Sequence, residues 1–468
     1  MRPGWCHVLG GWRWAVLWVW VAAFPMLADA AEPDAALETL NHITVLDLNT
    51  AARVALAGNP SLAAAQARVM QAGEIVRQAQ SAYWPQLDAT ASAARVDLAE
   101  RDFQSQNAFL QPLGQSIDNP ENYYRAGLNA SWLIFDGFAR KFSLAAARYG
   151  ERATAAARFD AQRLLLSAVT IAFLQAQLAD ENIAIARADA AFNQRLLEEA
   201  RLRYEVGTGA LSDVLNFQIR VNSAQSRLIQ EERVFQTNLI SLAALMGVPQ
   251  GRFPEQMGLA DLSPTTAREL TTPQAPDLIQ TAATLRPDLR QSEWRVQQAE
   301  AGVSRARAGY YPTIALSGSY EGERPEDIGF GQDDFGNSIG VGLTWNLFSG
   351  GLTRARHGEA KARLLETEYI RDDAFINVAA EVQRVTTQIT AAQQQLRLQE
   401  TNTELLQQQR DLVEKEYKAG VGSLVRLNEA QRDLTVSQAQ LALARVALRV
   451  SWYDLETATG RILETFKP

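Results

Sequence analysis

The sequence predicts an α+β fold in which one large module, a β-hairpin followed by a long helical hairpin, occurs twice. Three observations support this: an internal duplication, two long tracts without proline, and segments of alternating polarity. In the duplication, YWPQLDATASA from Tyr83 recurs as YYPTIALSGSY from Tyr310, and LNASWLIFDG from Leu128 recurs as VGLTWNLFSG from Val341. Solenoid repeats are about 20–50 residues long, so these much longer copies indicate a duplicated structural module.

Two constant offsets in numbering align the copies. The offset is 227 between Pro60 and Pro287 and between Pro85 and Pro312. It is 213 between Trp132 and Trp345, between Gly207 and Gly420, and between Gly247 and Gly460. The first copy therefore has 14 extra residues between Pro85 and Trp132. We expect a first repeat over 31–248 (β-hairpin about 84–135, helical hairpin about 137–247), a linker or equatorial region over 249–286, and a second repeat over 287–468 (β-hairpin about 311–348, helical hairpin about 350–460).

Residues 1–30 have the pattern of a secretory signal peptide. Arg2 and Arg13 flank an apolar run over 14–26, and Ala28-Asp29-Ala30 forms a small-residue cleavage site. A membrane anchor is the alternative, but the run is shorter than the ~18–20 residues that a spanning helix needs. The only cysteine, Cys6, lies in this segment, so we expect a mature chain without thiols or disulfides. No later stretch resembles a spanning helix.

Two tracts predict very long helices. Residues 121–248 and 326–467 contain no proline, and they are rich in Ala, Leu, Gln, Glu and Arg, which favour helix. We expect one helix from about Phe138 to Tyr204 and another from about Leu352 to Tyr417. At ~1.5 Å per residue each is on the order of 100 Å long. Their apolar residues recur every three or four positions, so each helix must pack lengthwise against partners.

Each long helix is followed by a glycine pair and a return helix. Gly207 and Gly209 precede a helix that reaches Met246, and Gly420 and Gly422 precede one that reaches Thr459. Glycine suits the left-handed position that ends a helix. Ser212 and Ser423 are the candidate N-caps of the return helices.

Alternating segments before the long helices predict strands. From Tyr124 to Ile134, apolar side chains alternate with small or polar ones, and the pattern recurs from Ser338 to Leu347. The preceding strands, about Pro85 to Ala94 and Pro312 to Tyr320, have a weaker alternation, and the stretches inside each strand pair, 100–122 and 321–336, are polar and turn-rich. Such alternation is typical of membrane barrel strands. A soluble sandwich hairpin is the alternative, but it does not explain a signal peptide and attached helices of ~100 Å.

Four strands cannot close a barrel, and lipid does not tolerate an open sheet edge. The chain must therefore associate with copies of itself. A rotationally symmetric ring would close the sheet and supply neighbours for the long helices.

The mature chain resembles the TolC-type outer membrane efflux and secretion channels. The resemblance rests on the duplication, the tyrosine-proline strand starts, the WLIFDG and WNLFSG junctions, the tips VGTGALSDVL and AGVGSLVRLN, and the closing LMGV and ATGR. It implies an α+β membrane protein that assembles as a homotrimer, with a shared 12-stranded outer-membrane β-barrel continued by a periplasmic α-helical barrel. It also implies passive export of drugs, small molecules or secreted polypeptides, together with a periplasmic adaptor and an inner-membrane pump or ABC exporter, in the outer membrane of a Gram-negative bacterium.

The resemblance also implies site residues. Adaptor contacts would come from the two tips: Val206, Gly207, Thr208, Gly209, Leu211 and Asp213, and Gly420, Val421, Gly422, Ser423 and Leu424. Asp213 aligns with Arg426, so the tips differ in charge near a helix N-terminus. Asp411 and Glu414 would form an acidic ring at the periplasmic entrance. A solvated acidic helix face is the alternative, and Gln408 stands where a second acidic ring would continue.

The sequence lacks the usual parts of an enzyme. The mature chain has two histidines, His42 and His357, no HExxH and no GxxxxGK[ST], so we expect no catalytic, metal or cofactor site. Losing the signal peptide changes the formal charge from −8 to about −9, which argues against nucleic acid as a partner. The competing interpretation is a periplasmic coiled-coil scaffold or adaptor without membrane strands. A diffusion porin is disfavoured, because it has no use for helices that cross the periplasm.

Overall fold

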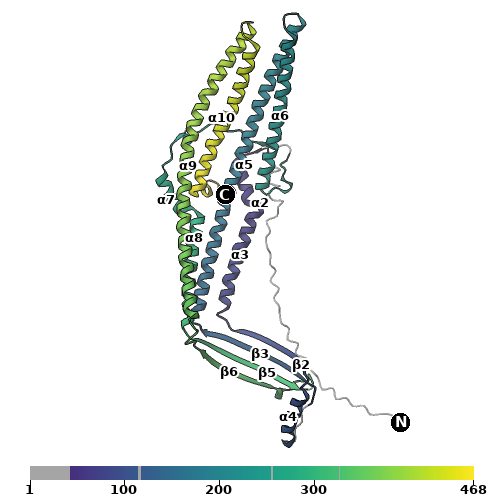
Figure 1. The fold of residues 1–468 in the computed structure, drawn as a ribbon, viewed down its shortest axis with the longest axis vertical. Coiled ribbons are helices and arrows are strands. Elements are labelled where there is room, and N and C mark those ends of the chain that lie inside the picture. Colours follow the sequence, from purple (N-terminus) through teal and green to yellow (C-terminus); the bar gives the residue numbers. More distant parts are fainter. Residues whose placement is uncertain (1–42, 114–117, 255–256, 326, 468) are drawn as a thin grey trace, which may run out of the picture.

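A computed structural model describes residues 43–113, 118–254, 257–325 and 327–467. The predicted signal peptide, Cys6 and His42 lie outside the described residues. The described chain is elongated: a four-stranded sheet occupies one end, and helices run from it to two hairpin tips at the other end (Figure 1).

The two repeats have the same order of elements. The first consists of α2 (Leu48–Gly58), α3 (Pro60–Ser81), β2 (Gln86–Val96), β3 (Glu121–Phe135), α5 (Ala139–Glu205) and α6 (Leu211–Leu245). The second consists of α7 (Ala275–Leu285), α8 (Pro287–Arg307), β5 (Thr313–Pro325), β6 (Phe335–Thr344), α9 (Leu352–Lys418) and α10 (Leu424–Thr459). The remaining α-helices and strands of the described residues are β1 (Val45–Leu46), which pairs in parallel with β4 (Gly258–Leu259), α4 (Glu100–Leu110) and α11 (Ile462–Thr465).

The structure confirms the two long helices, since α5 and α9 each contain 67 residues. It also contains elements that the sequence pattern did not predict. Helices α2 and α3 precede the first strand pair, and α7 and α8 occupy the equivalent places before the second strand pair. Helix α7 lies within the segment expected to be a linker. The stretch expected to be turn-rich from residue 100 begins instead with helix α4.

The end of each return helix packs against the junction of the two short helices in its own repeat. Gly247 and Gly460 have left-handed backbones, with φ of 74° and 79°. Asn59, at the α2–α3 junction, donates from Nδ2 to the carbonyl of Leu245 at 2.7 Å. Arg286, at the α7–α8 junction, donates to the carbonyl of Ala458 at 2.9 Å. Each bond satisfies a helix-end carbonyl that has no partner within the helix.

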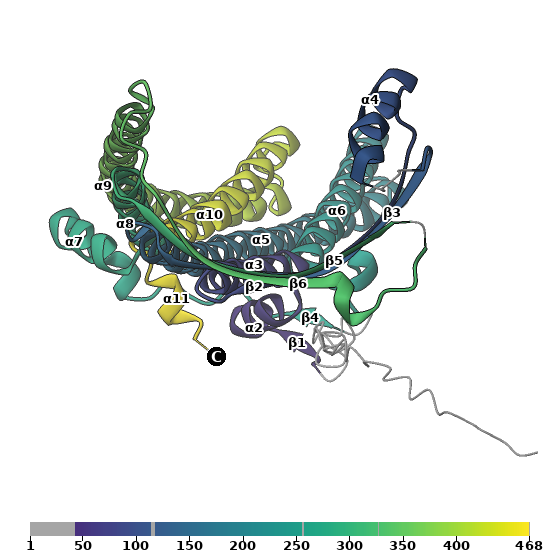
Figure 2. The ribbon, with the colours of Figure 1, turned by 90° about the horizontal axis from the view of Figure 1, so that it is seen from below.

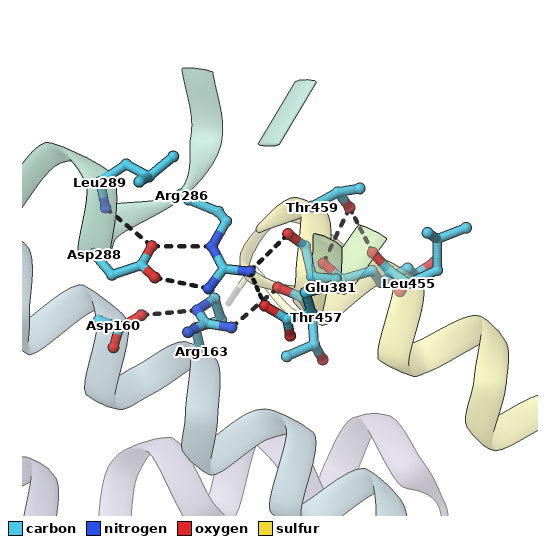
Figure 3. A network of polar contacts seen from close by, with 11 residues as sticks. Asp160, Arg163, Arg286, Asp288, Leu289, Glu381, Leu455, Thr457 and Thr459 are labelled. Atoms are coloured by element: carbon cyan, nitrogen blue, oxygen red, sulfur yellow. Dashed lines mark hydrogen bonds and ion pairs between the residues drawn. The ribbon is translucent and has the colours of Figure 1, made fainter. Parts of the chain in front are cut away.

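The joint of the second repeat is charged where that of the first is neutral. The buried Arg286 side chain forms ion pairs with Asp288 at 2.7 Å and Glu381 at 2.6 Å. From α5, the buried Arg163 donates to the carbonyl of Thr457 at 3.2 Å and pairs with Asp160 (Figure 3). Through Arg163 and Arg286, the end of α10 is therefore held by both repeats.

The protein core is spread along the helices in several clusters. One cluster holds α2, α5 and α6 together at mid-length, another joins α9 and α10, and a third lies at the tips. Contrary to the sequence-based expectation, one window of α5 is long and apolar enough to span a membrane by composition, but 56% of it is buried within the protein. Packing against neighbouring helices accounts for that apolar stretch.

Candidate functional site

The sheet has the antiparallel order β2-β3-β5-β6, so β2 and β6 are its edges. Apolar side chains of β3 and β6 lie exposed on one face, with Ile339 86% exposed and Val341 72% exposed. The opposite face carries small and polar residues, among them the cross-strand pair Asn129 and Ser319. The alternation expected for a membrane strand is therefore present, although β6 ends at Thr344 and not at Leu347.

The repeated tryptophans form hydrogen bonds to the backbone that joins the helices to the sheet. The indole of Trp132 donates to the carbonyl of Tyr83 at 3.0 Å, and that of Trp345 donates to the carbonyl of Tyr310 at 3.2 Å. Both tryptophans are exposed beside the apolar face. A ring with an apolar body and a polar N–H suits the boundary between lipid and water. The same bond in both copies explains why the tyrosine and tryptophan motifs recur together.

The two tips have the same backbone. In the first, Gly207 is left-handed, and the N–H groups of Thr208 and Gly209 both donate to the carbonyl of Arg203 at 2.9 Å. In the second, Gly420 is left-handed, and Val421 and Gly422 donate in the same way to Glu416. The turn between α5 and α6 and the turn between α9 and α10 both lie at the far end of the molecule from the sheet (Figure 1).

The side chains at the tips differ between the copies. Ser423 is the N-cap of α10, and its hydroxyl accepts from the N–H of Arg426 at 3.3 Å. Ser212 is not a cap, because α6 begins at Leu211 and its N-cap is Ala210, which has no side-chain oxygen. The expectation for Ser212 was therefore wrong. Leu211 and Val421 are exposed, and Leu424 is half-buried.

The charge difference at the tips has local consequences. Arg426 forms an ion pair with Glu416 at 3.5 Å, which offsets its unfavourable place near a helix N-terminus. Asp213 lies in the first turn of α6. Burial, together with the nearby Asp213 carboxylate, raises the pKa of the Tyr417 hydroxyl.

The expected gate carboxylates lie together on α9 but are not free of countercharge. Asp411 accepts from the amide of Gln407 at 3.1 Å and pairs with Arg410 at 3.1 Å. Glu414 pairs with Arg410 at 3.1 Å and with Lys418 at 2.8 Å. The acidic pair is therefore flanked by two cations of its own helix, which sequence spacing alone did not reveal.

Contacts between the two helical hairpins form a cluster that the sequence analysis missed. Buried side chains from α5, α6, α9 and α10 meet near the tips: Phe192, Leu196, Leu197, Ala200, Phe217, Val221, Val413, Leu427 and Ala430. The Arg410 guanidinium lies 5.1 Å from the centre of the Phe192 ring. These residues belong to apolar stripes along their helices. The sequence pattern reveals each stripe, but it does not identify the helix against which the stripe packs.

A polar cavity of about 530 Å³ adjoins the equatorial joint. It is lined by Arg163, Arg286, Glu381, Arg384 and Asp454, with other polar residues. Burial, together with the nearby Glu381, raises the pKa of Asp454. Near the sheet, His357 packs edge-on against Tyr310.

A family model described as outer membrane efflux protein matches residues 51–248 and 278–461, which correspond to the two repeats. The chain belongs to this family. It is 27% identical over 413 residues to the pyoverdine export outer membrane protein OpmQ of Pseudomonas aeruginosa, covering 87% of this chain and 84% of that one. It is 24% identical over 414 residues to the outer membrane protein TolC of Vibrio cholerae, covering 87% of this chain and 89% of that one.

Solved structures of outer membrane proteins have the same fold. The outer membrane protein VceC of Vibrio cholerae superposes with a TM-score of 0.71 at 22% identity, covering 88% of this chain and 96% of that one. The CmeC outer membrane channel of Campylobacter jejuni gives a TM-score of 0.76 at 18% identity, covering 88% of this chain and 85% of that one. As a member of this efflux and secretion channel family, the protein is an outer membrane transport protein that extends into the periplasm.

Proposed function

We propose that three copies of this chain form one channel through the outer membrane and conduct exported molecules passively. Each copy contributes four strands to a shared barrel of twelve, and its long helices form the wall of a periplasmic tunnel. Energy for export comes from an inner-membrane partner, since we assign no catalytic residue to this chain.

The single observation that carries this proposal is the sheet. Its outer face is apolar and exposed, while the outer edges of β2 and β6 pair with no strand of the described chain. In lipid each unpaired edge must be covered. Seen along the long axis, strands and helices follow one curved wall (Figure 2), a shape that suits a segment of a ring.

The tips are the proposed docking site for a periplasmic adaptor. Exposed side chains surround each turn, with Val206 and Leu211 in the first tip and Val421 in the second. The relatives include proteins named for pyoverdine export and for alkaline protease secretion. We therefore propose efflux or type I secretion with a matching inner-membrane pump or ABC exporter.

The acidic pair Asp411 and Glu414 is the proposed periplasmic gate. Removing both carboxylates (Asp411→Ala with Glu414→Ala) is expected to raise single-channel conductance or relieve block by divalent cations, because it removes the carboxylate oxygens of all three copies, the groups to which a divalent cation binds. Recordings in planar bilayers measure both. Glu404→Ala, an exposed carboxylate on the same helix, is the control and should change neither. Unchanged conductance and block in the double variant would leave the pair as an ordinary surface feature.

Membrane fractionation followed by a heat-modifiability gel tests the proposed assembly. The expected result is an outer-membrane protein whose unheated band migrates differently from the heated chain. A fully soluble monomer would instead favour the periplasmic scaffold, which needs no barrel.

A further inference from the structure

Four exposed cations occupy equivalent positions in the two repeats, near the sheet end of the long helices. Lys141 and Arg148 lie on α5, and Arg354 and Lys361 lie on α9. The offset of 213 that aligns the two copies relates Lys141 to Arg354 and Arg148 to Lys361. Basic residues therefore stand at the same two places in both copies, whereas most residues between these places differ.

The four cations have no countercharge within the described part of the chain. Other cations of the same region are paired: Arg77 with Glu74 at 2.7 Å, and Arg140 with Asp136 at 3.2 Å. No ion pair of the described residues includes any of the four. An exposed cation without an internal partner is available to an anion outside the chain.

Helix geometry places these cations on the outer face of the curved wall. Seven residues complete almost two turns, so in helices that pack lengthwise residues seven apart share a face. On α5 the series that starts at Lys141 reaches Val169, which belongs to one cluster with residues of α2. On α9 the equivalent series from Arg354 reaches Val382, which belongs to one cluster with Ala282 of α7. Helices α2 and α7 both lie on the convex side of the wall (Figure 2), so the cations face outward.

The cations also lie at the depth of a lipid headgroup layer. Trp132 and Trp345 stand beside the apolar face of the sheet, and α5 and α9 each begin seven residues after them. The cations are the third and tenth residues of each helix, about 3 and 14 Å along its axis at ~1.5 Å per residue. A headgroup layer is about 5–8 Å thick on each side of the bilayer core. Long basic side chains extend toward it, and the second cation lies within about one Debye length of it.

The basic character of this outer face is confined to the region nearest the sheet. The next positions in the two seven-residue series are Ala155 on α5 and Glu368 on α9. One further step along α9 is Phe375. The outward cations therefore form a band at one depth, as expected if they meet a flat anionic surface.

We infer that Lys141, Arg148, Arg354 and Lys361 form a basic collar that binds the anionic headgroups of phospholipids in the periplasmic leaflet of the outer membrane. The charge of the collar is complementary to a phosphodiester headgroup, and the collar continues the apolar face that meets the acyl chains. An anionic leaflet attracts each lysine or arginine near its surface. The inference rests on the proposed barrel, which sets the depth of the membrane, and goes beyond it by naming the lipid.

Spin-labelled phospholipids test the inference in the full-length mature protein reconstituted in vesicles. Electron paramagnetic resonance separates lipid immobilised at the protein surface from bulk lipid. It compares phosphatidylglycerol, which is anionic, with phosphatidylcholine, which has no net charge. The protein should favour phosphatidylglycerol by at least about twofold at low salt. Raising the salt from about 50 mM to about 1 M should abolish this preference, because exposed charges are then screened.

Matched variants assign the preference to the collar. Replacing all four collar residues by glutamine should remove it, and Arg354→Gln with Lys361→Gln alone should reduce it in part. The control is Arg356→Gln with Arg363→Gln, which removes two exposed cations from the same stretch of α9. Each control residue follows a collar residue by two positions, so it lies about 200° around the helix. The control should leave the preference unchanged.

Three results would overturn the inference. The first is equal association of the two lipids with the parent protein. The second is an equal loss of preference in the control variant, which would assign the effect to net charge. The third is competition by inorganic phosphate beyond that of chloride at equal ionic strength, which would indicate a small-anion site. Failure of the proposed barrel gives a different result, which is no immobilised component for either lipid.

Discussion

Replacing Gly247 by alanine is expected to destabilise the protein more than the same change at any of the tip glycines. Its φ is 74°, and an added Cβ would lie 2.4 Å from the carbonyl oxygen of Gly58 and 2.7 Å from its carbonyl carbon. Both obstacles are backbone atoms, so no side chain can move aside. The left-handed conformation costs about 1–2 kcal/mol for a residue with a Cβ, and overpacking costs about 1–3 kcal/mol more.

Two further glycines supply matched controls for this prediction. Gly207 has nearly the same φ, but nothing lies within 4 Å of an added Cβ, so Gly207→Ala should cost only the conformational part. Gly460 is intermediate, because its nearest neighbour would be the carbonyl carbon of Leu285 at 3.1 Å. Urea unfolding followed by circular dichroism measures the loss in free energy of unfolding. The loss should be largest for the change at Gly247, smaller at Gly460 and smallest at Gly207. A loss at Gly207 equal to that at Gly247 would contradict the close packing of the equatorial joint.

Arg286→Met is expected to cost about 3–5 kcal/mol of stability, the cost of removing one partner from a buried ion pair. The change leaves Asp288 and Glu381 without their shared cation and the carbonyl of Ala458 without its donor. Asn59→Ala is the control in the first repeat. It removes an amide that also caps α3, so we expect a loss of about 1–2 kcal/mol. An Arg286→Met loss no larger than that of Asn59→Ala would contradict the role of the charged joint.

The effect of Arg286→Met should depend on pH. Burial alone would raise the pKa of Asp288, but the hydrogen bonds and charge of Arg286 outweigh it and hold that pKa below the usual 3.8. A lowered folded-state pKa contributes stability above the unfolded value and loses it as the pH falls through the folded value. In the variant, burial without the Arg286 charge raises the Asp288 pKa, so the stability difference should be constant near neutral pH and shrink as the pH falls from the raised pKa of the variant to the lowered pKa of the wild type.

The sequence predicted the long helices and the strand pairs because their signals are local. Alternation marked the strands, and the absence of proline marked α5 and α9. Helices α3 and α8 were not predicted, because proline breaks a helix in its interior but is favoured at the first helical position, where Pro60 and Pro287 lie. The equal spacing of these prolines was the signal that could have revealed two equivalent helix starts.

The candidate site was predictable only where it depends on backbone turns. The glycine pairs marked both tips. The sequence pattern placed the N-cap of α6 at Ser212, whereas in the structure it is Ala210. Arg410 was missed for a different reason. Its pairing with Asp411 and Glu414 is local, but its contact with Phe192 depends on which faces of two distant hairpins meet. Such contacts follow from tertiary packing and leave no periodic trace in one sequence.

Single-channel recording of the protein extracted from outer membranes and reconstituted in planar bilayers tests the central claim most directly. If copies of this chain close their sheets into one barrel continued by a helical tunnel, insertion should give uniform conductance steps from the protein alone, without adaptor or pump. Absence of any conductance from a correctly folded preparation would contradict the channel and leave the chain as a periplasmic scaffold.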